Sequence, residues 1–283
     1  MRRTGAPAHA AAGDLLVITN NRARVFQRSI IQGASEVAAA RGYRVDVLEV
    51  PRPTVADEVL AALQRPPSGV LLIADVLLDE AVHELVGRGI TLTLVSHRVA
   101  RLEPPAIMHD NAQGMALLST HLLDECGRRN PVFLRGSERQ VDARQRERAW
   151  RRELMRRSLP FDESRFLRGE FEPDTAAASL ATFLDEGGTL DALVAADYPM
   201  ATAAMELLRN RGLRVPTDVA VAGFGDAPEA LEASLTCVAA DVVELGRRAA
   251  RQLVGQVEGL EIRGLTLLST NLVPRGSTDV GAS

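Results

Sequence analysis

The chain has 283 residues, of which 46% are hydrophobic, 25% are charged and 4% are aromatic. This length and apolar content suffice for one large or two medium domains with buried cores, and they exclude a wholly disordered chain. The formal net charge is −4, so no basic excess would attract nucleic acid. All 33 basic residues are arginines, which excludes any mechanism that needs a lysine Schiff base or a phosphate-loop lysine.

The cysteines and the apolar runs indicate the compartment. Cys126 and Cys237 are too few for a disulfide scaffold, and we expect both to be small buried hydrophobes in a reducing cytoplasm. No apolar run approaches the ~18 residues of a transmembrane helix, and the N-terminus lacks the apolar core of a signal peptide. We therefore expect a cytoplasmic protein, with residues 1–13 as a disordered arm and 279–283 as a tail.

In chain order, short β-branched runs alternate with stretches of helical periodicity. Gly42 after the first helix and Gly89 after the third are typical of helix C-termini, and Thr54 is a candidate N-cap. Up to residue 108 we predict strands at 15–19, 44–50, 70–73, 90–95 and 107–108, and helices at 26–41, 54–64 and 79–88.

The same alternation continues to the end of the chain. We predict helices at 111–126, 142–157, 175–186, 200–210 and 243–258, and strands at 132–134, 166–169, 192–195, 219–222, 265–268 and 272–273. Strands that alternate with helices indicate βαβ units and parallel sheets. About ten strands exceed what one compact sheet usually holds, so the sequence predicts an α/β protein with two doubly wound lobes. Ligands would then bind outside the carboxyl ends of the strands, in a cleft where the two lobes face each other.

The motifs of common catalytic sites are absent. No GxSxG nucleophile elbow is present, and the GxG at Gly223–Gly225 lacks the third glycine of a dinucleotide-binding fingerprint. None of the five histidines has a partner at a spacing that would place two imidazoles on one metal ion. Arg146 stands near the start of a charged predicted helix, where a guanidinium could clamp hydroxyl or carboxylate groups bidentately.

Six segments in order resemble one known family, the lactose-repressor/galactose-repressor (LacI/GalR) transcription regulators, from residue 14 to 278. They are VFQRSIIQGASEVAAARGY (25–43), SGVLLIAD with ELVGRGITLTLVSHR (68–75, 84–98), HDNAQGMALLSTHLLDECGRRNPVFLRG (109–136), DARQRERAW (142–150), GLRVPTDVAVAGFGDAPEA (212–230) and LTCVAADVVELGRRAARQLVGQVEG (235–259).

This resemblance implies a periplasmic-binding-protein-like type I fold, with two lobes joined by three crossovers. The N-terminal lobe would comprise 14–108 and 241–264, and the C-terminal lobe 109–240 and 265–278. It also implies a homodimer that is not an enzyme, needs no cofactor and binds a small effector between the lobes to modulate DNA binding. Only 13 residues precede the first predicted strand, too few for the family's helix-turn-helix, so we expect this chain alone not to read operator DNA.

The resemblance also implies a set of ligand-binding residues. Arg146 stands at the family's ligand arginine and would pair with an oxygen-rich effector. The family's acidic residue after the fourth strand is Ser96 here, and the first Asp of its "GFDD" motif is Gly225. A sugar or related polyol or acid is the default effector, although a less hydroxylated or anionic ligand would also suit the arginine. The predicted ligand-binding residues are Asn21, Phe26, Ser96, His97, Arg146, Asp197 and Asp226, with Phe26 walling the ligand and the two aspartates accepting hydrogen bonds or orienting Arg146.

Two other functions stay open at this point. The chain could be a stand-alone cytoplasmic sensor module that keeps the fold without any role in DNA binding. It could also be a Rossmann-like enzyme that uses Gly223–Gly225, which titration with a nicotinamide cofactor would reveal.

Overall fold

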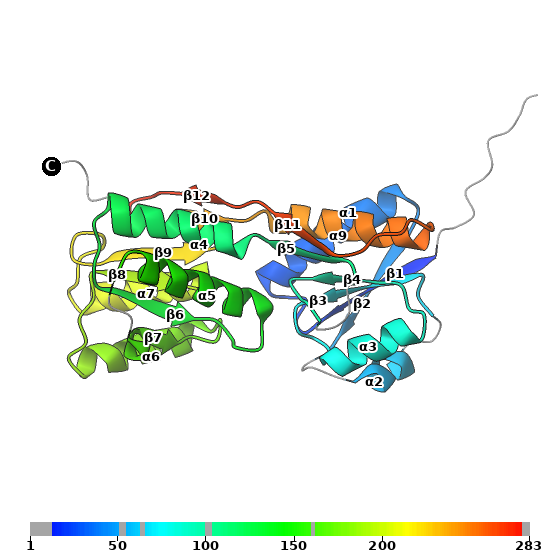
Figure 1. Ribbon diagram of the computed structural model, residues 1–283, viewed down its shortest axis with the longest axis horizontal. Coiled ribbons are helices and arrows are strands. Elements are labelled where there is room, and N and C mark those ends of the chain that lie inside the picture. Colours follow the sequence, from blue (N-terminus) through cyan, green and yellow to red (C-terminus); the bar gives the residue numbers. More distant parts are fainter. Residues whose placement is uncertain (1–12, 51–54, 63–65, 100–103, 160–161, 279–283) are drawn as a thin grey trace, which may run out of the picture. The chain divides into compact units, whose positions relative to one another are not determined.

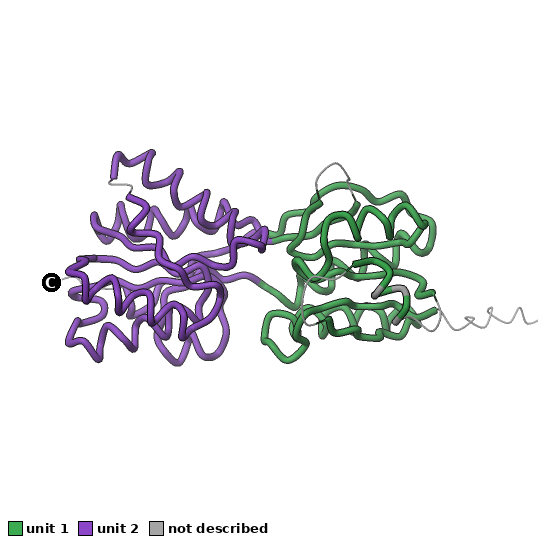
Figure 2. Tube along the Cα trace, turned by 90° about the horizontal axis from the view of Figure 1, so that it is seen from below, with its two compact units in different colours: residues 1–108, 241–268 green, residues 109–240, 269–283 purple. Residues whose placement is uncertain are grey.

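The computed structural model describes residues 13–50, 55–62, 66–99, 104–159 and 162–278 (Figure 1). These residues form two compact units (Figure 2). Unit 1 comprises the described residues up to Met108 together with Asp241–Leu268, and unit 2 comprises His109–Ala240 together with the described residues from Ser269 onward. The predicted arm, apart from Gly13, and the predicted tail lie outside the described residues.

Unit 1 is built on a six-stranded sheet with the order β11-β5-β4-β3-β1-β2. The parallel pairs β1–β2, β1–β3, β3–β4 and β4–β5 confirm the predicted doubly wound arrangement. Its strands are β1 (Asp14–Thr19), β2 (Arg44–Glu49), β3 (Gly69–Ile73), β4 (Leu92–Val95), β5 (Ala106–His109) and β11 (Leu265–Leu268). Its helices are α1 (Val25–Ala40), α2 (Ala56–Ala62), α3 (Asp79–Gly87) and α9 (Val242–Val257).

The two faces of this sheet carry separate cores. Leu15 and Val17 of β1 pack with α1 and α9, whereas Leu16 and Ile18 pack with α2 and α3 (Figure 1). Successive side chains of a strand point to opposite faces, so a strand covered on both sides needs an unbroken apolar run. The run at 15–18 is apolar throughout for this reason.

Helices α1 and α9 approach each other through two glycines. A Cβ atom on Gly33 would lie 2.0 Å from the carbonyl oxygen of Val243, and one on Gly246 would lie 2.2 Å from that of Ile30. Any side chain at either position would push the two helix backbones apart. The crossover into unit 1 at Asp241 is therefore anchored directly against α1.

Unit 2 repeats the design with a second six-stranded sheet, in the order β12-β10-β9-β8-β6-β7. Its strands are parallel except that β12 runs antiparallel to β10. They are β6 (Pro131–Arg135), β7 (Phe166–Arg168), β8 (Ala192–Ala195), β9 (Ala220–Phe224), β10 (Thr236–Ala239) and β12 (Asn271–Val273). The α-helices are α4 (Asn111–Ser119), α5 (Val141–Arg156), α6 (Pro173–Asp185), α7 (Tyr198–Asn210) and α8 (Pro228–Glu232).

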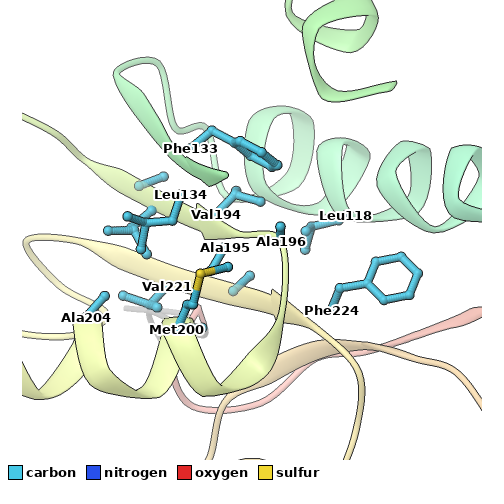
Figure 3. Close-up of a cluster of buried hydrophobic side chains, with 14 of the residues drawn as sticks. Leu118, Phe133, Leu134, Val194, Ala195, Ala196, Met200, Ala204, Val221 and Phe224 are labelled. Atoms are coloured by element: carbon cyan, nitrogen blue, oxygen red, sulfur yellow. The ribbon is translucent and has the colours of Figure 1, made fainter. Parts of the chain in front are cut away.

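A single large apolar cluster fills unit 2. Figure 3 shows part of this core, where side chains of β6, β8 and β9 lie next to those of α7. Phe133 of β6 stacks on Trp150 of α5, with ring centroids 6.3 Å apart. None of the helices in the described part of the chain has the length and apolar character needed to cross a bilayer.

Three features differ from the sequence predictions. β10 and α8 were not predicted, because four residues and five residues are too short to show a period. The predicted helix 111–126 changes to a π-helical turn at Thr120–Glu125. The strand 265–268, expected in the C-terminal lobe, pairs with β5 in unit 1, so the chain passes into unit 2 at Ser269 instead of residue 265.

Candidate functional site

The carboxyl end of the unit 2 sheet holds a buried polar group that we call the Arg146 cluster: Arg146, Asn111, Asp142, Gln145 and Phe224. Arg146 extends from α5 and donates through Nε to Oδ1 of Asn111 (2.8 Å) and through a terminal nitrogen to the carbonyl of Ala196 (2.7 Å). Ala196 directly follows β8, so the guanidinium lies where the strand ends.

The partners of Arg146 are themselves bonded. Asn111 donates through Nδ2 to Asp142 Oδ1 and to Gln145 Oε1, both at 2.8 Å. Asp142 Oδ2 lies 3.9 Å from Arg146, whose Cζ lies 3.7 Å from the ring centroid of Phe224. The aromatic face and the carboxylate both favour the cation. The guanidinium is thus held in one orientation.

Burial distinguishes this arginine from the surface arginines. Arg146 is 7% exposed and Asp142 is 6% exposed. Burial lowers the pKa of the Arg146 guanidinium, and the nearby carboxylates of Asp142 and Asp197 oppose that change. A buried, hydrogen-bonded charge with a perturbed pKa is typical of a functional site, although buried ion pairs also occur for structural reasons.

The two predicted aspartates of unit 2 have different partners. Asp197 caps α7, accepting from the backbone N–H of Met200 at 3.1 Å. Asp226 forms an ion pair with Arg275 at 2.8 Å. The prediction that Asp226 accepts hydrogen bonds from the ligand or orients Arg146 stays a prediction, and the described partner of Asp226 is Arg275. Arg275 follows β12, which pairs with β10 beside β9, and this tertiary pairing brings it to Asp226.

At the carboxyl end of the unit 1 sheet, three buried polar atoms have no hydrogen-bond partner among the described residues: Thr19 Oγ1, Gln27 Oε1 and Ser96 Oγ. Their residues are 0%, 6% and 3% exposed. Thr19 ends β1, Gln27 lies in the first turn of α1 and Ser96 follows β4. A buried polar atom without a partner is costly, so three at one end of a sheet indicate a place where a ligand or water completes the bonding.

The backbone at this end is also unusual. Ser96 has a φ of 53° and Ala74, directly after the neighbouring strand β3, has a φ of 57°. Residues other than glycine rarely adopt this left-handed conformation, and such positions cluster at binding and catalytic sites. The left-handed backbone of Ala74 and Ser96 therefore points to the ends of β3 and β4.

The remaining predicted residues of unit 1 follow β4 or β1 in the chain or lie in the first turn of α1. His97 follows Ser96, is buried, and places Nε2 3.8 Å from Asp79 of α3. Asn21 Oδ1 accepts from the backbone N–H of Ala23 and shapes the turn into α1. Phe26 is half-buried against the core under α1 and α9.

Several important residues were not predicted. Asn111 opens α4, and the neighbouring Asp110 caps this helix by accepting from the backbone N–H of Gln113 at 2.9 Å. Asp142, Thr19 and Gln27 gave no sequence signal beyond their places near strand or helix ends. Among the described residues, no group of three or more histidine, cysteine or acidic side chains is arranged to hold a metal ion.

Comparisons with known proteins agree with this architecture. The family model of the periplasmic binding protein-like domain matches residues 120–278. The HTH-type transcriptional regulator CelR of Thermobifida fusca is 30% identical over 278 residues, which cover 93% of this chain and 80% of CelR. The HTH-type transcriptional repressor CytR of Escherichia coli K12 is 25% identical and covers 93% of this chain and 79% of CytR. These relatives are regulators of transcription and not enzymes.

Two solved structures show the same fold. A complex of the regulator CelR with cellobiose superposes with a TM-score of 0.82 at 27% identity, covering 93% of this chain and 84% of that chain. A lac repressor dimer bound to operator and an anti-inducer gives a TM-score of 0.83 at 22% identity, covering 94% and 93%. At 22% identity, the match to the lac repressor supports the fold alone.

Proposed function

The chain belongs to the LacI family of transcriptional regulators, with their periplasmic-binding-protein-like domain, and from this premise we propose that it senses a small metabolite. Binding of this effector changes the affinity of the regulator for operator DNA, because the effector binds one conformation of the sensor better than another. The protein acts in the cytoplasm, where transcription takes place, and it acts as a homodimer.

Two separate observations carry this proposal: a buried arginine at the strand ends of unit 2, and orphaned polar atoms at the strand ends of unit 1. A guanidinium has five N–H donors, and the described hydrogen bonds of Arg146 use two of them. Thr19, Gln27 and Ser96 supply a further hydroxyl, an amide and a hydroxyl. Such donors and acceptors, together with the half-buried ring of Phe26, suit a ligand with several oxygens and an apolar ring face.

A sugar or a related polyol or acid is the effector class that fits best. A solved structure of the relative CelR is a complex with cellobiose, which supports a carbohydrate. Arg146, Ser96, His97 and Asp197 contact its oxygens, and Phe26 stacks on its ring. Asn21 positions Phe26 through the turn, since its side chain is bonded to Ala23. Asp226 acts through Arg275, its ion-pair partner.

A thermal-shift screen tests the effector class. Cellobiose, monosaccharides, sugar acids and purine nucleosides are added separately, and a ligand at 100 times its Kd stabilises the native state by about 2.7 kcal/mol. We expect a carbohydrate or sugar acid to raise the melting temperature. A shift by nucleosides alone, or by none of these compounds, would contradict the proposed class.

A substitution then tests the site. Ser96→Ala removes one hydroxyl and should weaken effector binding by about tenfold in calorimetric titration, the value of one buried hydrogen bond. Ser164→Ala removes an exposed hydroxyl from unit 2 and serves as the matched control. An unchanged Kd in Ser96→Ala would remove Ser96 from the site.

A further inference from the structure

The two cysteines have different surroundings. Cys237 of β10 is fully buried, and burial, aided by the carboxylate of Asp226, raises its pKa to about 12. A thiol in that setting stays protonated and unreactive. Cys126 is half-buried, directly follows the π-helical turn and lies beside an imidazole. The expectation that both cysteines are buried hydrophobes is therefore wrong for Cys126.

The π-helical turn brings Cys126 to this imidazole. The backbone N–H of Cys126 donates to the carbonyl of His121, five residues earlier, at 2.9 Å. In an α-helix, side chains five residues apart point about 140° away from each other. Here Cys126 Sγ lies 3.7 Å from His121 Nε2. Such turns are rare and are found frequently at functional sites.

A carboxylate and the C-terminal segment complete the arrangement. Glu125 Oε2 lies 2.8 Å from His121 Nδ1, which fixes the ring with Nε2 on the side of Cys126 Sγ. Thr278 Oγ1 lies 2.7 Å from the other ring nitrogen, and the Cys126 thiol donates to the Thr278 carbonyl at 3.6 Å. A nucleophile beside a base that a third group orients is the pattern of activated nucleophiles.

We propose that Cys126 is a modification site, a thiol that His121 activates for reaction with small electrophiles such as hydrogen peroxide. The thiol turns from the Thr278 carbonyl to His121 Nε2, displaces the Thr278 hydroxyl there and passes its proton to this nitrogen, and the thiolate attacks one peroxide oxygen. An S–O bond forms as the O–O bond breaks, and the departing hydroxide takes the proton from His121 and leaves as water. Sulfur is oxidised by two electrons to sulfenic acid, and the peroxide is reduced.

This reaction has a structural consequence because Cys126 contacts the last described residue of the chain. Thr278 is fully buried and its hydroxyl lies 2.7 Å from that of Thr236 in β10. The preceding Ser277 donates to the carbonyl of Val221 in β9 at 2.6 Å. An added oxygen on Cys126 Sγ crowds the Thr278 carbonyl, so oxidation weakens the attachment of residues 275–278 to the unit 2 sheet.

Peptide-resolved mass spectrometry of the folded chain tests the proposal, with Cys237 as the internal control. A free thiol is only a few per cent thiolate at pH 7, so activation should make Cys126 react with iodoacetamide about tenfold faster than free cysteine, while Cys237 stays unlabelled. Hydrogen peroxide with dimedone should give a sulfenic-acid adduct on Cys126 and none on Cys237. A rate no faster than that of free cysteine, or no adduct, would overturn the proposal.

Variants separate activation from packing. His121→Gln should slow the labelling of Cys126 about tenfold, Glu125→Gln should slow it several-fold, and His83→Gln on α3 should leave it unchanged. If His121→Gln does not fold, both cysteines should be labelled faster. The labelling rate of Cys126 in Glu125→Gln then tests the proposal, because Glu125 lies at an exposed position. The role of the imidazole would be refuted if Cys126 were labelled as fast in Glu125→Gln as in the unmodified chain, and if His121→Gln either gave that same rate or did not fold.

Discussion

The carboxyl ends of the two sheets have opposite polar character. In unit 2 the Arg146 cluster is charged and its members are bonded to one another. In unit 1 the corresponding polar atoms are neutral, and Thr19 Oγ1, Gln27 Oε1 and Ser96 Oγ have no partner among the described residues. Two sheets with the same winding therefore arrange polar side chains differently: in unit 2 they hydrogen-bond to one another, whereas in unit 1 three of them have an atom without a partner among the described residues.

The largest expected effect lies in the Arg146 cluster. Arg146→Ala removes the cation and leaves Asp142 buried without a counter-charge, which should lower the free energy of unfolding of unit 2 by about 3–5 kcal/mol. Trp150 is the only tryptophan and lies buried in unit 2, so its fluorescence during urea unfolding reports this unit. Arg152→Ala, at an exposed position of the same helix, is the control, with an expected change below about 0.5 kcal/mol. If Arg146→Ala and Arg152→Ala lowered the free energy of unfolding equally, the Arg146 cluster would not stabilise unit 2 in the way described.

A substitution in unit 1 should change the free energy of unfolding in the opposite direction. Thr19→Val replaces an unpaired buried hydroxyl with a methyl group of similar size, so the free energy of unfolding should stay constant or rise by up to about 1 kcal/mol. Calorimetry of the chain and hydrogen exchange in β1 measure this change. Thr182→Val on the exposed face of α6 provides the matched control. A loss above about 1 kcal/mol in Thr19→Val would show that this hydroxyl has a structural partner in solution.

The smallest expected effect concerns an exposed ion pair of unit 2. The Arg214 guanidinium, followed by its backbone N–H, lowers the pKa of Asp218 to about 2. Because the native pKa is below that of the unfolded chain, the stabilisation is complete above pH ~4 and disappears as the pH falls toward 2. The melting temperature of Asp218→Asn should therefore lie slightly below that of the unmodified chain at pH 7, and the difference should close on acidification. If the two melting temperatures still differed by the same amount at pH 2, the ion pair with Arg214 would not be the cause. High salt should reduce the difference at pH 7.

The sequence predicts the alternation of strands and helices well because long periodic elements carry their own signal. The unbroken apolar run at 15–18 and the helix that contains Arg146 are examples. Local pattern carries no information on partners far along the chain. Arg275 reaches Asp226 across 49 residues, and Asn111 reaches Asp142 across 31. The orphaned atoms of Thr19 and Ser96 could not be predicted either, since an unsatisfied group is defined by the fold around it.

The contact of Gly33 with Val243 affects how the protein is made. One face of α1 packs against α9, a helix that the ribosome produces only after the whole of residues 109–240. At the usual speed of translation this delay is on the order of ten seconds. During that time the nascent N-terminal segment exposes Ile30, Ala34 and Ala38, which makes it a substrate for chaperones until α9 emerges.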